Sequence, residues 1–167
     1  ELVENSIDAG ATSVEVSFED GGRNVVIKDN GHGIQKDQLA LAFARHATSK
    51  ISTSNDLWQL SSFGFRGEAL ASISSVSRMT MTSQTPESKK AYQVHSEFGQ
   101  LGEVTAAGGD EGTLVEIHDL FENIPARLKF LKSDAAESLQ IKNMLKSLAM
   151  AHPHVDFRVR QNQKLLF

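Results

Sequence analysis

A short stretch at the start of the sequence places acidic and amide side chains at helical spacing. Glu1, Asn5 and Asp8 lie at positions i, i+4 and i+7, so they share one face of a predicted helix. Asn is unfavourable inside a helix because its side chain competes for backbone hydrogen bonds. Its amide oxygen suits magnesium, and a carboxylate one turn away could activate a water beside that metal. The alternative for this face is an ordinary solvated helix surface.

A second stretch runs from Asp29 to Gly33 and follows an apolar strand. A carboxylate at the end of a buried strand is partly desolvated and needs hydrogen-bond donors, and the exocyclic amine of adenine is one such donor. Gly31 and Gly33 would let a ligand approach the backbone closely. The alternative is a tight turn, since Asp-Asn-Gly is common turn chemistry. His32 is expected to be a spacer rather than a ligand.

A third stretch is rich in glycine and precedes a predicted helix that begins at about Glu68. Gly64 and Gly67 flank Phe65 and Arg66. Backbone N–H groups at a helix N-terminus, with glycines nearby, can form a nest for an anion. The pattern is not that of a P-loop, so it indicates a different phosphate-binding architecture. The alternative is a flexible glycine loop.

Two smaller features accompany these stretches. Thr48, Ser49 and Lys50 add two hydroxyls and a cation upstream of the glycine loop. Gly112 and Thr113 begin a later strand. The Thr113 hydroxyl could donate to a ligand that is bound on the same sheet surface as Asp29.

The elements that must position these residues follow from hydrophobic periodicity. Helices are predicted at residues 1–9, 36–47, 68–75 and 135–151, and strands at residues 13–18, 25–27, 78–83, 91–97, 103–106, 113–119 and 157–160. Residues 48–67 are predicted to form a long mobile loop, which in a compact domain is often a lid. The strands cluster in hairpins with helices between the clusters. The predicted fold class is therefore α+β, with helices on one face of a mostly antiparallel sheet.

Length and composition fit one globular domain over residues 1–167. The chain is 40% hydrophobic and 23% charged, has no cysteine, and shows neither a signal peptide nor a membrane span. Its formal net charge of −4 argues against a general nucleic-acid-binding protein. The charge is uneven, however, since residues 126–167 carry 8 Lys and Arg against 3 Asp and Glu. This segment is either a solvated basic surface or a surface for phosphate backbones.

Together these stretches resemble the four motifs of the GHKL ATPase superfamily, which has the Bergerat nucleotide-binding fold. Asn5, the Asp29-x-Gly31-x-Gly33 turn, the glycine-rich segment at 64–67 and Gly112-Thr113 occur in the order of those motifs. Three further segments resemble the MutL family of DNA mismatch-repair proteins, and the similarity covers nearly the whole chain. They are residues 45–51, 64–73 and 123–131. A bacterial member is the best match.

The resemblance implies ATP hydrolysis with ATP and Mg²⁺ as cofactors. It implies that Glu1 is the general base, that Asn5 binds the magnesium and that Asp29 accepts from the adenine amine. The other nucleotide-binding residues that it implies are Ala9, Gly31, Gly33, Thr48, Ser49, Lys50, Gly64, Phe65, Arg66, Gly67, Leu70 and Thr113. The segment at 123–131 is typical of the family but has no evident chemical role beyond a helix start at its Pro-Ala-Arg.

The resemblance also implies partners. It predicts a homodimer or a heterodimer with another MutL-family chain, a MutS-type mismatch-recognition partner, and DNA contacts through the basic region at 126–164. It predicts a cytoplasmic, nucleoid-associated protein in bacteria or a nuclear one in eukaryotes. We expect the chain to be part of a longer protein that is truncated here at both ends. The alternatives are a nucleotide-binding interaction module without turnover and a phosphotransfer kinase with the same nucleotide fold.

Overall fold

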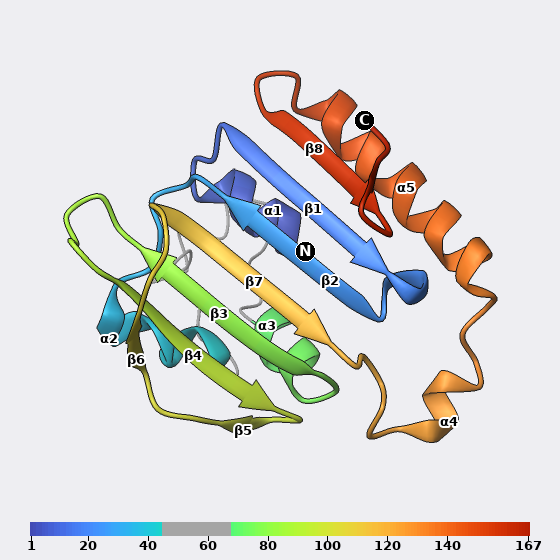
Figure 1. The fold of residues 1–167 in the computed structure, drawn as a ribbon, viewed down its shortest axis with the longest axis horizontal. Helices are drawn as coiled ribbons and strands as arrows, with labels where there is room; N and C mark the ends of the chain where they lie inside the picture. Colours follow the sequence, from blue (N-terminus) through green and yellow to red (C-terminus); the bar gives the residue numbers. More distant parts are fainter. Residues whose placement is uncertain (45–67) are drawn as a thin grey trace, which may run out of the picture.

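The computed structural model describes residues 1–44 and 68–167, and a single mixed sheet forms its centre (Figure 1). The strands are β1 (Ser13–Glu19), β2 (Asn24–Asp29), β3 (Arg78–Gln84), β4 (Ala91–Glu97), β5 (Gln100–Leu101), β6 (Thr105–Ala107), β7 (Gly112–His118), β8 (Asp156–Gln161) and β9 (Lys164–Leu165). Their order is β5-β4-β3-β7-β2-β1-β8-β9, and β6 also pairs with β4. Among the described strands, only β1 and β8 pair in parallel.

Helices cover one face of this sheet. They are α1 (Leu2–Asp8), α2 (Lys36–Leu39), α3 (Ala69–Ser74) and α5 (Asp134–Ala151), with single 3₁₀ turns η1 (Asp20–Gly22) and η2 (Leu41–Phe43). The short helix α4 (Pro125–Leu128) lies off the edge of the sheet, in the connection from β7 to α5 (Figure 1). Figure 1 shows α1 and α3 behind the sheet and α5 along its β8 side. Within residues 1–44 and 68–167, no helix has the length and apolar character needed to cross a membrane. The α+β class with helices on one face is confirmed.

The strand register builds a continuous apolar row under the helices. Val16 of β1, Ile27 of β2, Val115 of β7, Met81 of β3 and Val94 of β4 are successive cross-strand partners, and all are buried. Side chains alternate between the faces of a strand, so residues two positions further along return to this same face. The core face of the sheet is therefore a set of parallel rows, and a polar residue in one of them lies directly beside the core.

One of these rows becomes polar. Two positions beyond the apolar row, Asp29 of β2 pairs with Thr113 of β7, which pairs with Ser83 of β3. Asp29 and Ser83 are buried. The register thus places three polar side chains side by side at one end of an otherwise apolar face. Buried polar groups are costly unless they are paired, so this row is where a site is expected.

The predicted single helix over residues 36–47 is wrong. The chain forms α2, then the tighter turn η2, and Ala44 is extended with φ −74° and ψ 141°. Leu39 and Phe43 are both buried in one cluster, so the 3₁₀ turn keeps their packing while the helix ends early. Residues 45–47 lie outside the described residues. The predicted strand at 103–106 is displaced to β6.

Candidate nucleotide-binding site

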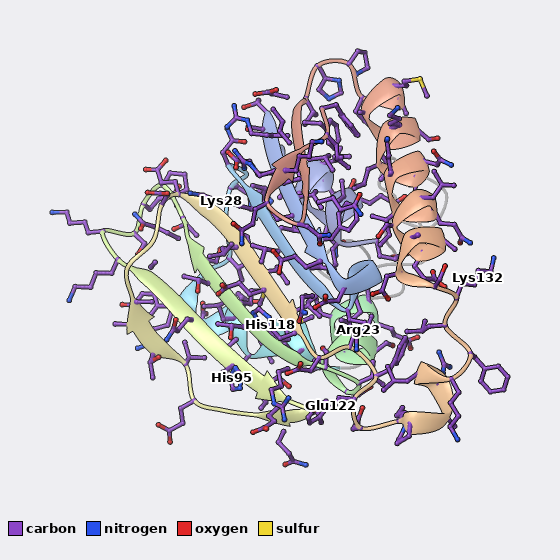
Figure 2. All side chains as sticks on the ribbon, turned by 45° about the vertical axis from the view of Figure 1, so that its right-hand side comes forward. Arg23, Lys28, His95, His118, Glu122 and Lys132 are labelled. Carbon is purple, nitrogen blue, oxygen red and sulfur yellow. The ribbon has the colours of Figure 1, made fainter. Side chains whose placement is uncertain are left out.

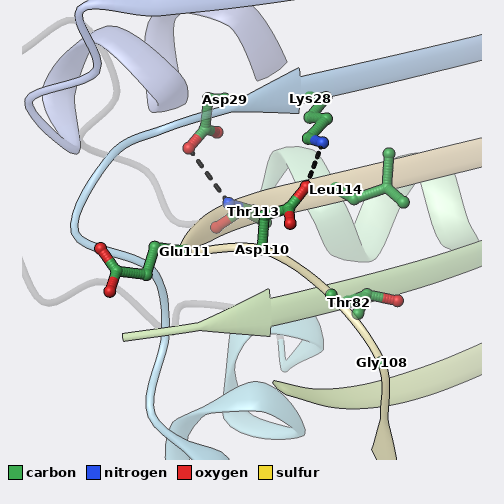
Figure 3. A pocket seen from close by; sticks show the side chains of 9 residues that line it. Lys28, Asp29, Thr82, Gly108, Asp110, Glu111, Thr113 and Leu114 are labelled. Atoms are coloured by element: carbon green, nitrogen blue, oxygen red, sulfur yellow. Dashed lines mark hydrogen bonds and ion pairs between the residues drawn. The ribbon is translucent and has the colours of Figure 1, made fainter. Parts of the chain in front are cut away.

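The Asp29 carboxylate is the most tightly held polar group of the polar row. Its Oδ2 accepts from the Ser6 hydroxyl of α1 at 2.7 Å. Its Oδ1 accepts from the backbone N–H groups of Gly31 at 2.9 Å and Thr113 at 3.2 Å. Figure 3 shows the contact between Asp29 and Thr113. An ionised carboxylate offers about four acceptor positions, so these three donors from the described chain leave capacity for one more donor at Oδ2.

Ser83 and Thr113 form a short hydroxyl chain beside Asp29. Ser83 Oγ accepts from the Ile34 N–H at 2.8 Å and donates to the Gly112 carbonyl at 2.8 Å. Thr113 Oγ1 lies 3.0 Å from Ser83 Oγ. Because the single hydroxyl hydrogen of Ser83 goes to Gly112, Thr113 is the donor in that contact. The network therefore favours Thr113 as an acceptor toward a ligand, whereas the sequence suggests a donor.

The glycines around Asp29 are required by the chain's own packing. At Gly33, where φ is +68°, a Cβ would lie 2.2 Å from the Gln84 carbonyl oxygen. At Gly31 a Cβ would lie 2.8 Å from the Ala9 carbonyl oxygen. The sequence suggests that these glycines let a ligand approach. The structure gives a different reason, because they let the turn after β2 lie against α1 and β3.

Helix α1 connects this row to the predicted catalytic residues. Val3 is buried in the core and Ile7 packs against it, as their spacing predicts, while Ser6 reaches Asp29. At the helix end, the Ala9 carbonyl accepts from the His32 N–H at 2.9 Å. Glu1 is the exposed N-cap of the helix. Residues 1–9 rise about 12 Å at helical spacing, so Glu1 lies at the far end of α1 from the turn after β2.

The structure places only part of the predicted site. The backbone N–H groups of Gly31 and Thr113 contact Asp29. Ala9 lies against Gly31, and Gly33 lies in the same turn, against Gln84. Leu70 is on α3, where it packs against the buried cluster that holds Leu39. His32 is exposed and its Nδ1 lies 2.8 Å from its neighbour's carbonyl, which agrees with a spacer. The remaining predicted residues lie outside the described residues; they are Thr48, Ser49, Lys50, Gly64, Phe65, Arg66 and Gly67.

Asn5 is compatible with a magnesium ion that is held mainly by other ligands. The residues that the structure describes contain no group of three His, Cys, Asp or Glu side chains that could hold a metal alone. Magnesium in nucleotide sites takes one or two protein oxygens and completes its shell with phosphate and water. A single amide oxygen on α1, one turn from a carboxylate, fits that donor set.

Sequence reasoning missed Ser6 and Ser83. Ser6 lies between Val3 and Ile7 on the buried stripe of α1, and it is only 4% exposed. Ser83 continues the alternation of Met79 and Met81 on the core face of β3. The available signal in both cases is a small polar residue at a position whose periodicity demands an apolar one.

A pocket of about 130 Å³ lies at this end of the sheet. Asp29 and Thr113 of the polar row line it together with Lys28, Thr82 and Asp110 (Figure 3). Lys28 Nζ lies 2.6 Å from Asp110 Oδ2. This hydrogen bond lowers the pKa of Asp110 and raises that of Lys28. The pair is exposed and joins β2 to the turn before β7 at the edge of this pocket.

The open face of the sheet is polar and mixed in charge. Figure 2 shows Lys28, His95 and His118 on it. Arg158 and Arg160 of β8 pair with Glu15 at 2.9 and 3.2 Å. Two cations of the predicted basic region at 126–164 therefore share one carboxylate of β1, which balances part of their charge.

Comparisons with known proteins agree with this geometry. Residues 1–106 match the profile of the histidine kinase-, DNA gyrase B- and HSP90-like ATPases. The whole chain is 52% identical to a DNA mismatch repair protein MutL of Neisseria meningitidis serogroup C, and 99% of it is 52% identical to the MutL of Shewanella frigidimarina. The chain spans only 26% and 27% of those two relatives.

Solved structures share the fold. The Aquifex aeolicus MutL ATPase domain complexed with ADP matches 99% of this chain with a TM-score of 0.78 and 32% identity, and the match covers 59% of that domain. The N-terminal domain of a DNA repair protein matches 99% of the chain with a TM-score of 0.80 and 28% identity, and the match covers 49% of that protein.

Proposed function

Because the chain belongs to the histidine kinase-, DNA gyrase B- and HSP90-like ATPase family, we propose that it binds and hydrolyses ATP as the N-terminal ATPase domain of a MutL-type DNA mismatch-repair protein. The observation that carries the proposal is the buried Asp29 carboxylate, which the described chain supplies with three donors and which can accept one more. The similarity to MutL proteins over the whole chain, including an ADP-bound domain, supports the choice of ligand and of pathway.

The adenine base would lie on the polar row. Its exocyclic amine would donate to Asp29 Oδ2, and Thr113 Oγ1 would accept from a ligand donor or from a bridging water. Ser6 and the N–H groups of Gly31 and Thr113 hold the carboxylate in place before any ligand arrives. Such preorganisation spares the ligand the entropy cost of ordering the site. The predicted lining residues Ala9, Gly31 and Gly33 would line this position.

The phosphates would lie toward the N-terminal end of α1 and toward α3. Asn5 would hold a magnesium ion, which when bound would neutralise phosphate charge. Glu1 would accept a proton from the attacking water, one helical turn away from Asn5. Leu70, and the predicted residues between 48 and 67, would complete the phosphate half.

At the level of the whole protein, we propose a nucleotide-driven dimerisation switch. ATP contacts would favour a closed pair of ATPase domains, and hydrolysis would reset it. The partner chain would be a second copy or another MutL-family chain, and a MutS-type protein and DNA would be further partners. DNA would meet the lysines of α5 in the basic region at 126–164. The expected location is the cytoplasm of a bacterium, near the nucleoid.

The proposal is tested with Asp29→Asn. The amide can still accept from Gly31 and Thr113 and can donate to Ser6, so the fold should persist. It then presents no acceptor to the adenine amine. We expect affinity for a non-hydrolysable ATP analogue with magnesium to fall at least about tenfold by calorimetric titration, as for the loss of a hydrogen bond to a charged group. Asp156→Asn, an exposed change at the start of β8, is the matched control.

Two outcomes would contradict the proposal. Wild-type protein that is folded but binds no adenine nucleotide would refute it directly. Equal binding by wild type and Asp29→Asn would remove Asp29 from the adenine site. Nucleotide binding without phosphate release by the intact protein would instead favour the interaction module without turnover.

A further inference from the structure

The family segment at 123–131 begins with a side chain that contacts helix α3. Asn123 Nδ2 donates to the Ser75 carbonyl at 3.1 Å. Ser75 is the C-cap of α3, and its carbonyl has no partner inside the helix. The distance in sequence is 48 residues, so this is a tertiary contact and not a local turn. The motif therefore has a physical role that its sequence alone does not reveal.

Two neighbouring backbone groups extend this contact. The Phe121 N–H donates to the Val76 carbonyl at 2.7 Å, and the Phe98 N–H donates to the Ser77 carbonyl at 2.9 Å. Three successive carbonyls after α3 are thus held by two other segments, the loop after β7 and the turn after β4. We call this set of three hydrogen bonds the α3 brace.

The two segments of the brace are strained and are held by one arginine. Phe98 and Phe121 have φ values of +46° and +67°, which are unfavourable for aromatic residues. The Arg78 guanidinium lies 4.8 Å from the Phe98 ring centroid and donates to Asp119 at 2.6 Å and to Glu97 at 3.1 Å. It also pairs with Glu122. Such strained conformations persist only where surrounding contacts fix them. The contacts of Arg78 therefore hold the two segments of the brace in place.

Helix α3 needs such support because it is short. Its six residues are too few for a stable isolated helix. Leu70 and Ile73 pack against the buried cluster under β3 and β7, which fixes one side of the helix. Figure 1 shows α3 behind the sheet, near the end of β7 from which the chain continues to α4. The brace fixes the remaining freedom at its C-terminal end.

Both ends of the proposed nucleotide site are tied to the same two strands. The β3–β7 ladder runs without a break from Arg78 opposite His118 to Gln84 opposite Gly112. Ser83 and Thr113 lie at its adenine end, and the brace lies at its other end. A change in the brace should therefore move α3 and Leu70, while Ser83 and Thr113 at the adenine end stay in place.

We propose that Asn123 is a positioning residue of the nucleotide site, which acts by fixing α3 and so the phosphate half of the pocket. The inference rests on the proposed function, because it assigns the α3 side to the phosphates. Asn123 touches no ligand in this assignment. Its effect is selective, since phosphate-bearing ligands depend on α3 and the adenosine moiety depends on Asp29.

The test compares Asn123→Asp with two other variants in the intact protein. Aspartate keeps the shape of asparagine but cannot donate to the Ser75 carbonyl when ionised. Asn24→Ala is the matched control, because Asn24 Oδ1 accepts from the Asp119 N–H at 3.2 Å and so anchors the same loop away from α3. Asn123→Gln restores a donor amide on a longer side chain. ADP and adenosine are titrated against each, and hydrogen exchange is followed in residues 69–77.

We expect Asn123→Asp to weaken ADP binding about fivefold, in line with one hydrogen bond, and to leave adenosine binding within twofold of wild type. Amide protection in residues 69–77 should fall in this variant, and Asn123→Gln should recover part of both effects. Asn24→Ala should lower the unfolding temperature without this ligand selectivity.

Other results would overturn the inference. If wild type binds ADP and Asn123→Asp binds it equally well, Asn123 has no positioning role although the proposed function stands. If ADP and adenosine affinities fall together, or Asn24→Ala gives the same selectivity, the contact is merely structural. If wild type binds no ADP, the proposed function fails and the inference fails with it.

Discussion

Ser6 is the residue that links α1 to the Asp29 carboxylate. Its hydroxyl is buried, and its 2.7 Å bond to Asp29 Oδ2 is the shortest of the three that hold this carboxylate. The same hydroxyl lies 3.4 Å from the Leu2 carbonyl, which is its only alternative acceptor within the described contacts. A hydroxyl bonded to a buried carboxylate contributes more than one bonded to a helix carbonyl.

We therefore expect Ser6→Ala to lower the free energy of unfolding by about 1–2 kcal/mol and to weaken ATP binding less than Asp29→Asn does. The loss arises because Asp29 Oδ2 keeps its burial but loses a donor. Denaturant unfolding and calorimetric titration measure the two effects.

Ser138→Ala is the matched control for this change. Ser138 is also buried on a helix, but that helix is α5, which carries none of the residues of the proposed nucleotide site. Nucleotide affinity should be unchanged in this variant. An equal loss of affinity in both variants would show that burial of any helical serine suffices, and the role assigned to Ser6 would be wrong.

Asp29 stands out in the sequence, whereas its two serine neighbours give only a weak signal. A carboxylate at the end of an apolar run is conspicuous because it contradicts the pattern around it. Ser6 and Ser83 contradict their patterns only slightly, since a buried serine is common. Their function depends on which strands become neighbours, and local periodicity carries no information about that pairing.

Among the elements, the turn after β2 is the one whose geometry the site depends on most. It carries Gly31 and Gly33 between Ala9 on one side and Gln84 on the other. Asn30 fixes its start, because its Oδ1 accepts from the backbone N–H groups of Thr12 and Ser13 at 2.9 and 2.8 Å. The turn is thus clamped against α1, β1 and β3 at once.

This clamping predicts very different costs for two glycine substitutions. Gly33→Ala should lower the free energy of unfolding by about 3 kcal/mol or more, because its Cβ would meet the Gln84 carbonyl at 2.2 Å. Gly10→Ala should cost only about 1 kcal/mol, since Gly10 has a similar φ of +73° but no atom within 4 Å of its Cβ position. Denaturant unfolding of the two variants separates steric overlap from backbone preference. Equal costs would mean that the turn relaxes and that the clamp is loose.

Elements with a strong hydrophobic period were predictable from the sequence. Elements whose ends are set by tertiary packing were not. The alternation of Val14, Val16 and Phe18 predicts β1, and the Pro-Ala-Arg start predicts α4, which has Pro125 in its first turn. The early end of α2 was not predictable, because residues 36–44 read as a continuous helix. Burial of Phe43 beside Leu39 overrides that propensity.

For the molecule as a whole, charge distribution bears on the proposed DNA contact. Arg158 and Arg160 share the single carboxylate of Glu15, so part of their charge is balanced within the sheet. Lys142 and Lys146 lie on α5, and Lys146 Nζ lies 6.0 Å from the Phe167 ring centroid. Outside β8 the basic region carries Arg127, Lys129, Lys132, Lys142, Lys146 and Lys164, of which Lys142 and Lys146 lie together on the long helix α5.

We expect the double variant Lys142→Gln/Lys146→Gln to weaken DNA binding and to reduce the slope of log K against log salt by about 2. The matched control is Lys89→Gln/Lys90→Gln, which removes the same charge from the exposed turn between β3 and β4. Fluorescence anisotropy at several salt concentrations measures both. A salt slope that is the same in all three proteins would exclude α5 from the DNA surface.

The order of strands in the sheet has a consequence for synthesis on the ribosome. Thr113 follows Asp29 by 84 positions, and the Arg158 that pairs with Glu15 follows it by 143. The β1–β2 hairpin therefore leaves the exit tunnel long before β7 and β8 exist to cover its two edges. During that interval the nascent chain exposes unpaired strands and has no adenine floor. Nucleotide cannot assist folding until β7 has emerged, so its own ligand gives the early hairpin no protection.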